Sequence, residues 1–281
     1  MFNNIWAVYE PAFVVPLGEM LKKGIQAGPV DDAKRAGINI QKFGDVAVIG
    51  LNGPMVKNES FLTKYYGFAS TISTQRAIES AVADDEISTI VMMIESPGGS
   101  VAGLPELGAA VAKAASVKRV IAQVSDMAAS AAYYVASQAT EIRANEMAMI
   151  GSIGTRLMMY DTSKAYEAAG VKAIPIDTGE YKSAGADGTV ITDNQIADFQ
   201  RIVDAYFEDF VSKVASGRGM QESQILKVAD GRMYFAAEAL SLGLIDRVAT
   251  MDQTLSELKQ ERARSTTTAK ARMMLNSKLI G

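Results

Sequence analysis

Strand-like apolar runs alternate with helix-like repeats through the middle of the chain. Three runs are almost continuously hydrophobic, as expected for strands buried on both faces of a sheet: residues 45–53, 87–99 and 119–125. Residues 71–85 and 101–116, which lie between them, have the three-to-four spacing of amphipathic helices. This alternation predicts βαβ units, and therefore an α/β fold with a mostly parallel sheet.

The same reading extends towards the C-terminus. It predicts three further strands, within residues 141–145, 148–160 and 171–179. From Thr192 onwards apolar residues recur every three or four positions, which predicts a long amphipathic helix. Residues 236–250 are read as a final helix and strand. The pattern divides the chain into an N-terminal leader (1–45), one α/β domain (46–250) and a polar C-terminal tail (251–281), which we expect to be partly helical.

Composition removes several kinds of chemistry. The 281 residues include neither cysteine nor histidine, which excludes disulfides, thiolate nucleophiles and a Ser-His-Asp triad. Zinc and copper sites become improbable without these ligands, and we expect no metal and no cofactor. The net charge of −4 gives no basic excess that would point to nucleic acid as the main partner. The local exception is the stretch 254–281, with six Lys/Arg and two Asp/Glu.

Membrane signals are also weak in this sequence. No apolar run approaches the roughly 20 residues that span a bilayer. The opening stretch lacks a basic segment, and Pro11 and Pro16 interrupt it, so it does not resemble a signal peptide. We therefore expect a cytoplasmic protein without a membrane anchor.

One serine lies in a setting that suits a nucleophile. In the stretch SDMAASAAYYVAS, Ser130 has alanines on both sides and precedes an apolar helical pattern. The small neighbours allow a tight turn, and the start of a helix favours a developing negative charge. Taken alone, however, Ser130 is more readily explained as a helix cap, because serine is a preferred capping residue.

Three other short motifs contain residues that could assist such a serine. Gly98 and Gly99 follow a buried strand, where free backbone N–H groups could form an oxyanion hole. Lys182 lies among glycines and small residues, and a lysine acts as a general base when burial lowers its pKa. Ser152 stands in GSIGT, where its hydroxyl could orient a lysine amine. Taken alone, the glycines are better explained as an ordinary turn and Lys182 as a solvated loop residue, and Ser152 has simple turn chemistry as its alternative.

Together, and in this order, the motifs SPGG, SAAYY, GSIG and YKS resemble the signal peptide peptidase A family of serine proteases. The phage head-maturation proteases of that family are the most similar, and the resemblance covers about residues 46–248. It implies a Clp-protease/crotonase-like fold of stacked ββα units. It further implies a Ser–Lys dyad in which Ser130 is the nucleophile, Lys182 the general base and Ser152 the hydroxyl that bonds the lysine. Gly98 or Gly99, together with Ala131, falls on the oxyanion hole.

The resemblance also implies homo-oligomeric rings whose active sites draw on neighbouring subunits. The sequence departs from the family at Ala131 and Ala132, where two glycines are frequent, and lacks the membrane anchor of the signal-peptide-degrading members. We therefore expect a capsid protease of a phage or prophage. It would cleave scaffold, coat or portal proteins, and the chain itself is a further candidate substrate.

Three alternatives stay open on the sequence alone. One is a cytosolic peptidase of the same family that degrades signal peptides or oligopeptides. Another is a capsid assembly or scaffold protein that keeps the fold without the chemistry. The third is a crotonase-like acyl-CoA enzyme, which the Ser/Lys pair disfavours.

Overall fold

A mostly parallel sheet forms the centre of the molecule. The computed structural model describes residues 6–8 and 40–279, so residues 1–5 and 9–39 of the predicted leader lie outside the described part. The strands are β2 (Ile40–Phe43), β3 (Val46–Asn52), β6 (Thr89–Ser96), β8 (Arg119–Ala129), β9 (Glu141–Ala144), β10 (Met149–Gly151), β11 (Met233–Phe235) and β12 (Arg247–Val248).

These strands are arranged in the order β11-β10-β8-β6-β3-β2. In addition, β9 pairs with β8, and β12 pairs with β9. The pairs β3–β6, β6–β8 and β8–β10 are parallel, whereas β2 and β11 run antiparallel at the two edges. The predicted α/β class with a mostly parallel sheet is confirmed.

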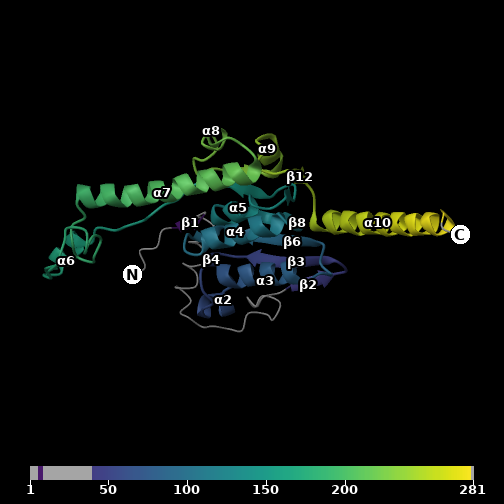
Figure 1. Cartoon of the computed structure of the whole chain (residues 1–281). Helices are drawn as coiled ribbons and strands as arrows, with labels where there is room; N and C mark the ends of the chain where they lie inside the picture. The colour runs from purple at the N-terminus through teal and green to yellow at the C-terminus, as the bar shows by residue number, and fades with distance from the viewer. Residues whose placement is uncertain (1–5, 9–39, 280–281) are drawn as a thin grey trace.

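Both faces of this sheet are covered, which explains why its central strands are hydrophobic throughout. One face packs against α3 (Thr71–Ala83), α4 (Leu104–Ala115) and α5 (Ala131–Ala136) and forms the main core. The other face forms a smaller cluster with the start of α10 (Met251–Leu279), where Leu258 is buried. The rest of α10 extends away from the sheet (Figure 1). The tail predicted to be partly helical is therefore helical from residue 251 to residue 279.

A second, smaller sheet lies at the carboxyl end of β6. Its order is β1-β7-β4-β5, formed by β1 (Trp6–Val8), β7 (Gly98–Ser100), β4 (Met55–Val56) and β5 (Ala69–Ser70). Pro97 separates β6 from β7 and has no N–H group to continue the first ladder. The chain turns there and enters the second sheet. The short helix α2 (Phe61–Tyr65) lies between β4 and β5 in the sequence.

After β10 the chain leaves the body of the molecule and forms an arm, which we define as residues 155–192. The arm contains α6 (Ser163–Ala168) and otherwise irregular backbone. The strand expected within 148–160 forms, but only over Met149–Gly151. The strand expected within 171–179 does not form, so that prediction is wrong. Ile174 and Ile176 are 71% and 95% exposed, so the apolar pattern that predicted a buried strand has no partner within the described chain.

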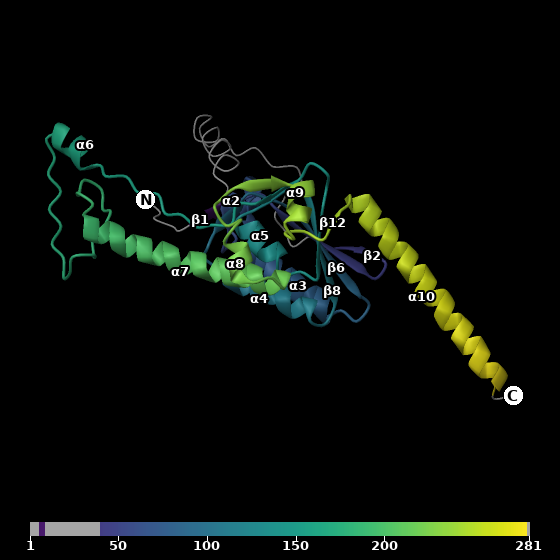
Figure 2. The same ribbon diagram turned by 90° about the horizontal axis from the view of Figure 1, so that it is seen from above.

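The predicted long helix is confirmed as α7 (Asp193–Arg218). Thr192 caps it, since its hydroxyl accepts a hydrogen bond from the N–H of Gln195 while the Gln195 side-chain oxygen accepts one from the N–H of Thr192. Only its C-terminal half packs on the body; the N-terminal half projects outwards and ends beside the arm (Figures 1 and 2). The short helices α8 (Glu222–Ile225) and α9 (Ala236–Ser241) follow and lead into β12.

Candidate functional site

The carboxyl ends of three neighbouring parallel strands meet at one place. In the ladder between β6 and β8, Ser96 is opposite Ala128, and in the next ladder Gly151 of β10 is opposite Ala129. Ala129 and Gly151 are the last paired residues of their strands, and Ser130 and Ser152 follow them directly. The turn at Pro97 follows Ser96 in the same way. The carboxyl edge of a parallel sheet is where open α/β folds bind ligands, and it brings these sequence motifs together.

Ser130 occupies a strained turn between β8 and α5. Its φ of 53° and ψ of −119° are unusual for a residue with a side chain. The N–H of Ser130 donates to the carbonyl of Gly151 at 2.7 Å, and its carbonyl accepts from the N–H of Tyr134 at 2.9 Å. Its hydroxyl donates only weakly to the Gly154 carbonyl, at 3.4 Å. The backbone is held firmly while the hydroxyl is loosely bound, which suits a nucleophile.

Ser152, beside it, also has a positive φ. Its φ is 51°, and its N–H donates to the Arg232 carbonyl at 2.7 Å. The side chains of Ser130 and Ser152 are both buried. Because the N–H of Ser130 bonds the residue that precedes Ser152, the two hydroxyl-bearing residues stand on adjacent strand ends.

The two candidate oxyanion glycines differ in their surroundings. The N–H of Gly98 already donates to the Ser96 hydroxyl at 3.2 Å. Gly99 lies so close to β4 that a Cβ atom would stand 2.1 Å from the Met55 carbonyl oxygen. Ala131 is the first residue of α5, so its N–H belongs to the group that no helical carbonyl can accept. The N–H of Gly98 is thus already engaged, which leaves Gly99 and Ala131 as the candidate donors to an oxyanion.

Lys182 lies elsewhere in the single chain. It is exposed on the arm, in a turn where its N–H donates to the Gly179 carbonyl. Nearby, the Gln195 side chain donates to the Glu180 carbonyl at 2.9 Å, which attaches this turn to the first turn of α7. The helix first approaches the Ser130 region at Val203, whose carbonyl accepts a hydrogen bond from the Thr155 hydroxyl at 2.9 Å. Val203 lies about 12 Å beyond Gln195 along the helix axis at 1.5 Å per residue. One chain by itself thus keeps Lys182 away from Ser130.

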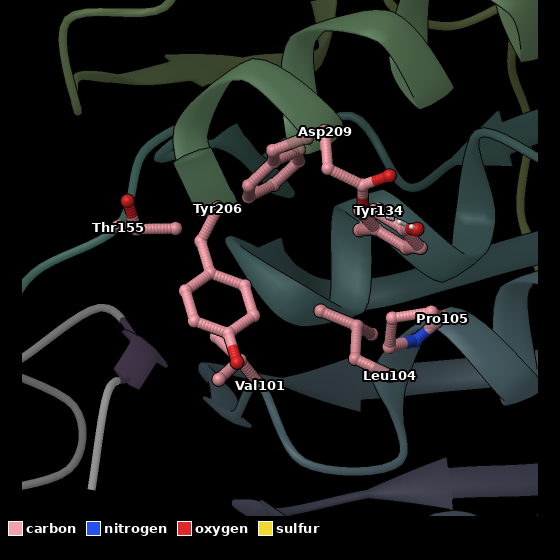
Figure 3. Close-up of a pocket in the computed structure, with 8 residues that line it drawn as sticks. Val101, Leu104, Pro105, Tyr134, Thr155, Tyr206 and Asp209 are labelled. Atoms are coloured by element: carbon pink, nitrogen blue, oxygen red, sulfur yellow. Dashed lines mark hydrogen bonds between the residues drawn. The ribbon is translucent and has the colours of Figure 1, made fainter. Parts of the chain in front are cut away.

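A mainly apolar pocket adjoins the serine and was not predicted from the sequence (Figure 3). Thr155 on its wall follows Gly154, whose carbonyl accepts the Ser130 hydroxyl, and Val101 follows β7 directly. The apolar periodicity of the sequence identified Tyr206 only as a residue on the apolar face of a helix. It did not predict which residues from other elements would lie next to Tyr206 in the pocket. The lining residues come from α4, α5, α7 and two loops: Val101, Leu104, Pro105, Tyr134, Thr155, Tyr206, Asp209 and Phe210.

One polar pair lies among these apolar side chains. The Tyr134 hydroxyl donates to the Asp209 carboxylate at 3.0 Å. Burial raises the pKa of Tyr134, and the nearby negative charge of Asp209 raises it further, so the hydroxyl stays protonated. The Tyr134 ring also packs edge-to-face on Phe210 at 5.4 Å. These contacts fix α7 against α5 and shape the floor of the pocket.

Two kinds of feature do not occur in the part of the chain that the structure describes. No three or more acidic side chains come together in an arrangement that could hold a metal ion there. None of the described helices combines the length and the apolar character that a membrane crossing requires.

Comparison with known proteins finds similarity to several proteases. The family model described as Peptidase family S49 matches residues 112–265, more than half of the chain. A putative protease of Methanocaldococcus jannaschii is 31% identical over 177 residues, covering 63% of this chain and 57% of that protein. The capsid assembly protease C of Escherichia phage lambda is 26% identical over 229 residues, covering 82% and 52% respectively.

A putative signal peptide peptidase SppA of Enterococcus faecium is 24% identical over 233 residues, covering 83% of this chain and 67% of that protein. The chain spans between about half and two thirds of the length of the relatives at the head of the comparison. The matched region runs from α4 through Ser130, Ser152 and the arm to α10. The chain belongs to peptidase family S49.

Proposed function

We propose that the chain is a serine endopeptidase in which Ser130 is the nucleophile. The observation that carries this proposal is the strained, buried Ser130 at the strand end, beside Ser152 and the N–H groups of Gly99 and Ala131. A strained backbone persists only where its surroundings enforce it, and such positions concentrate at active sites. The stacked strand–strand–helix units further fit the proposed Clp-protease/crotonase-like fold.

The general base of this protease is Lys182 of a second copy of the chain. A base must come within hydrogen-bond reach of the proton it takes, about 3 Å. Within one chain the arm holds Lys182 near the far end of α7, and the arm exposes large apolar side chains such as Ile174 and Ile176. An arm that docks on a neighbour would bury this surface and deliver the lysine. Repeating the contact head to tail closes a ring.

The chemical steps follow from these positions. Neutral Lys182 takes the proton of the Ser130 hydroxyl, whose oxygen attacks the peptide carbonyl. The N–H groups of Gly99 and Ala131 stabilise the oxyanion, and Ser152 orients the lysine amine. The charged lysine then protonates the leaving amine, and water releases the acyl group from Ser130. The apolar pocket accommodates the side chain before the cleaved bond.

The biological role we propose is that of a capsid-maturation protease of a phage or prophage, which cleaves scaffold and coat proteins. The names of two similar proteins support this role. They are the capsid assembly protease C of phage lambda and the head-tail preconnector protein GP5 of Enterobacteria phage P21. The similarity to the signal peptide peptidase SppA favours the second candidate, a peptidase that degrades signal peptides or oligopeptides.

Mixing two inactive variants tests the shared active site. Ser130→Ala and Lys182→Ala are each expected to lose at least about 10³-fold in the cleavage rate of a labelled unfolded protein. Mixed in equal amounts and allowed to exchange subunits, they should recover about a quarter of the parent activity, since random head-to-tail assembly pairs an intact serine with an intact lysine at that frequency.

Two controls accompany the mixture. A double variant that carries both substitutions, mixed with Ser130→Ala, should recover nothing. A fluorophosphonate probe should label Ser130 in the mixture, seen as a mass increase of its tryptic peptide. If subunits exchange and the mixture still stays inactive, the lysine does not act from a second copy.

A further inference from the structure

The outer edge of β7 is occupied by the chain's own N-terminal residues. β1 pairs antiparallel with β7 in the register Trp6–Ser100, Ala7–Gly99 and Val8–Gly98. Thus a three-residue strand from the N-terminal segment pairs with all three residues of β7, among them the proposed oxyanion donor Gly99. In Figure 3 this short purple strand is visible on the side of the pocket where Tyr206 and Val101 lie.

The other edge of β7 is not open to a ligand. It pairs with β4, with Met55 opposite Gly99. The main chains approach so closely that a Cβ on Gly99 would collide with three backbone atoms of Met55, at 2.1 to 2.7 Å. Any peptide that pairs with the oxyanion strand must therefore use the edge that β1 occupies.

We propose that β1 is an intramolecular competitor of the substrate: residues 6–8 occupy the strand position that an extended substrate peptide takes on β7. This inference rests on the proposed function and adds the regulation of the site. Peptides that add a strand to a sheet edge gain affinity from main-chain hydrogen bonds. A strand tethered in the same chain competes at an effective concentration that a free peptide must exceed. One edge holds one strand, so substrate enters only when β1 leaves.

The first test measures peptide binding in a background that cannot cleave. A fluorescein-labelled peptide with the sequence of residues 1–12 is titrated into Ser130→Ala protein, and its anisotropy is recorded. The same titration is repeated after Trp6→Pro and Ala7→Pro are added together. Successive N–H groups of a strand face opposite sides, so the double change removes whichever one bonds β7.

The proline variant is expected to bind the peptide about tenfold more tightly than its parent, because the competing strand no longer occupies the edge. The matched control carries Trp6→Ser and Ala7→Ser, which keep both N–H groups and should bind as the parent does. Equal affinity in all three proteins would overturn the proposal. Peptide binding is measured without catalysis, so its result does not depend on whether the proposed protease mechanism is correct.

The second test uses active protein with Ser130 intact. The two prolines should lower KM for an unfolded substrate about tenfold and leave kcat unchanged, because only access to the edge changes. The free peptide should then inhibit the proline variant competitively. An unchanged or higher KM would mean that β1 does not exclude substrate. Absence of cleavage and of fluorophosphonate labelling in every protein would refute the protease mechanism, while the binding result would still decide the role of β1.

Trp6 provides an independent signal, because it is the only tryptophan of the chain. Displacement of β1 by a saturating unlabelled peptide should change the tryptophan emission of the Ser130→Ala protein. The peptide for this measurement is the same sequence with Trp6→Phe, so that it adds no tryptophan of its own. Emission that stays constant at saturation would count against displacement of the strand.

Discussion

At the level of single residues, Ser130 and Ser152 stand out by their backbone conformation. Both residues have φ near +50° although they carry side chains. The sequence reading anticipated a serine at the start of a helix, and α5 does begin at Ala131. It did not anticipate that β8 continues to Ala129, which makes the turn at Ser130 abrupt. Small alanines permit this turn, and the bond from Ser130 to the Gly151 carbonyl holds it.

Gly99 yields a prediction at this scale. The change Gly99→Ala should lower the free energy of unfolding by about 3 kcal/mol or more, because its Cβ would overlap the rigid, buried main chain of Met55. Displacing β4 or β7 to relieve the overlap should also reduce fluorophosphonate labelling of Ser130. Urea denaturation and probe labelling measure the two effects.

Gly179→Ala is the matched control for stability, since a Cβ there meets no atom within 4 Å and its φ is not positive. It should change the free energy of unfolding by less than about 1 kcal/mol. A Gly99→Ala protein as stable as this control would show that β7 and β4 can separate without cost.

At the level of elements, periodicity predicted helices better than strands. The apolar spacing after Thr192 gave α7 correctly, because a helix satisfies its own backbone hydrogen bonds. The stretch 171–179 was wrongly predicted as a strand, because a strand requires a partner that one chain does not supply within the described residues. In the assembly we propose, these residues would lie against a neighbouring copy.

The C-terminal helix shows how charge and burial cooperate. Arg143 of β9 is buried and donates to Glu141 of the same strand and, at 2.9 Å, to Glu257 of α10. On α10, Thr254 donates to Gln123 of β8 at 2.7 Å. These polar contacts surround the apolar contact of Leu258, so the first turns of α10 dock in one register.

This network predicts how stability depends on pH. Hydrogen bonds from Arg247 and Arg143 hold the pKa of Glu257 below its ordinary value of 4.5. Burial would raise the pKa of Glu141, yet its bonds to Arg143 and Arg119 hold it below the same value. Carboxylates with a lowered pKa stabilise the fold fully above about pH 4.5, and that contribution is lost as the pH falls through the folded pKa.

Arg143→Met should therefore unfold more easily at about pH 7 and lose less stability between about pH 7 and pH 3 than the parent. Hydrogen exchange should locate the change in residues 251–262. Arg201→Met is the control, because its ion pair with Asp198 lies on the exposed surface of α7. Identical pH profiles for Arg143→Met and the parent would mean that this network does not anchor α10.

At the level of the whole molecule, the arm and α10 extend from opposite sides of a well-packed body (Figures 1 and 2). The arm exposes large apolar side chains, among them Tyr160, Ile174 and Ile176. Large exposed apolar surface commonly marks an interface. An isolated copy would then be an incomplete enzyme, and the ring would be the unit that cleaves proteins.

The choice of substrate tests the proposed biological role. A capsid-maturation protease should cleave coat and scaffold proteins of the phage or prophage that encodes it, and cleave free signal peptides far more slowly. Mass spectrometry of the products with parent and Ser130→Ala proteins measures the ratio of kcat/KM for the two substrate classes. Faster cleavage of signal peptides would favour the second candidate function.

The sequence by itself determined the α/β class, most of the helices and central strands, and the short motifs around Ser130, Ser152, Gly99 and Lys182. Local pattern suffices for these, because burial and helix formation follow periods of two to four residues. Only the tertiary structure decided that two serines share adjacent strand ends, that Lys182 lies apart from them in one chain, and that β1 covers the edge of β7. Those relations depend on strand register and on contacts between distant segments, which local periodicity does not specify.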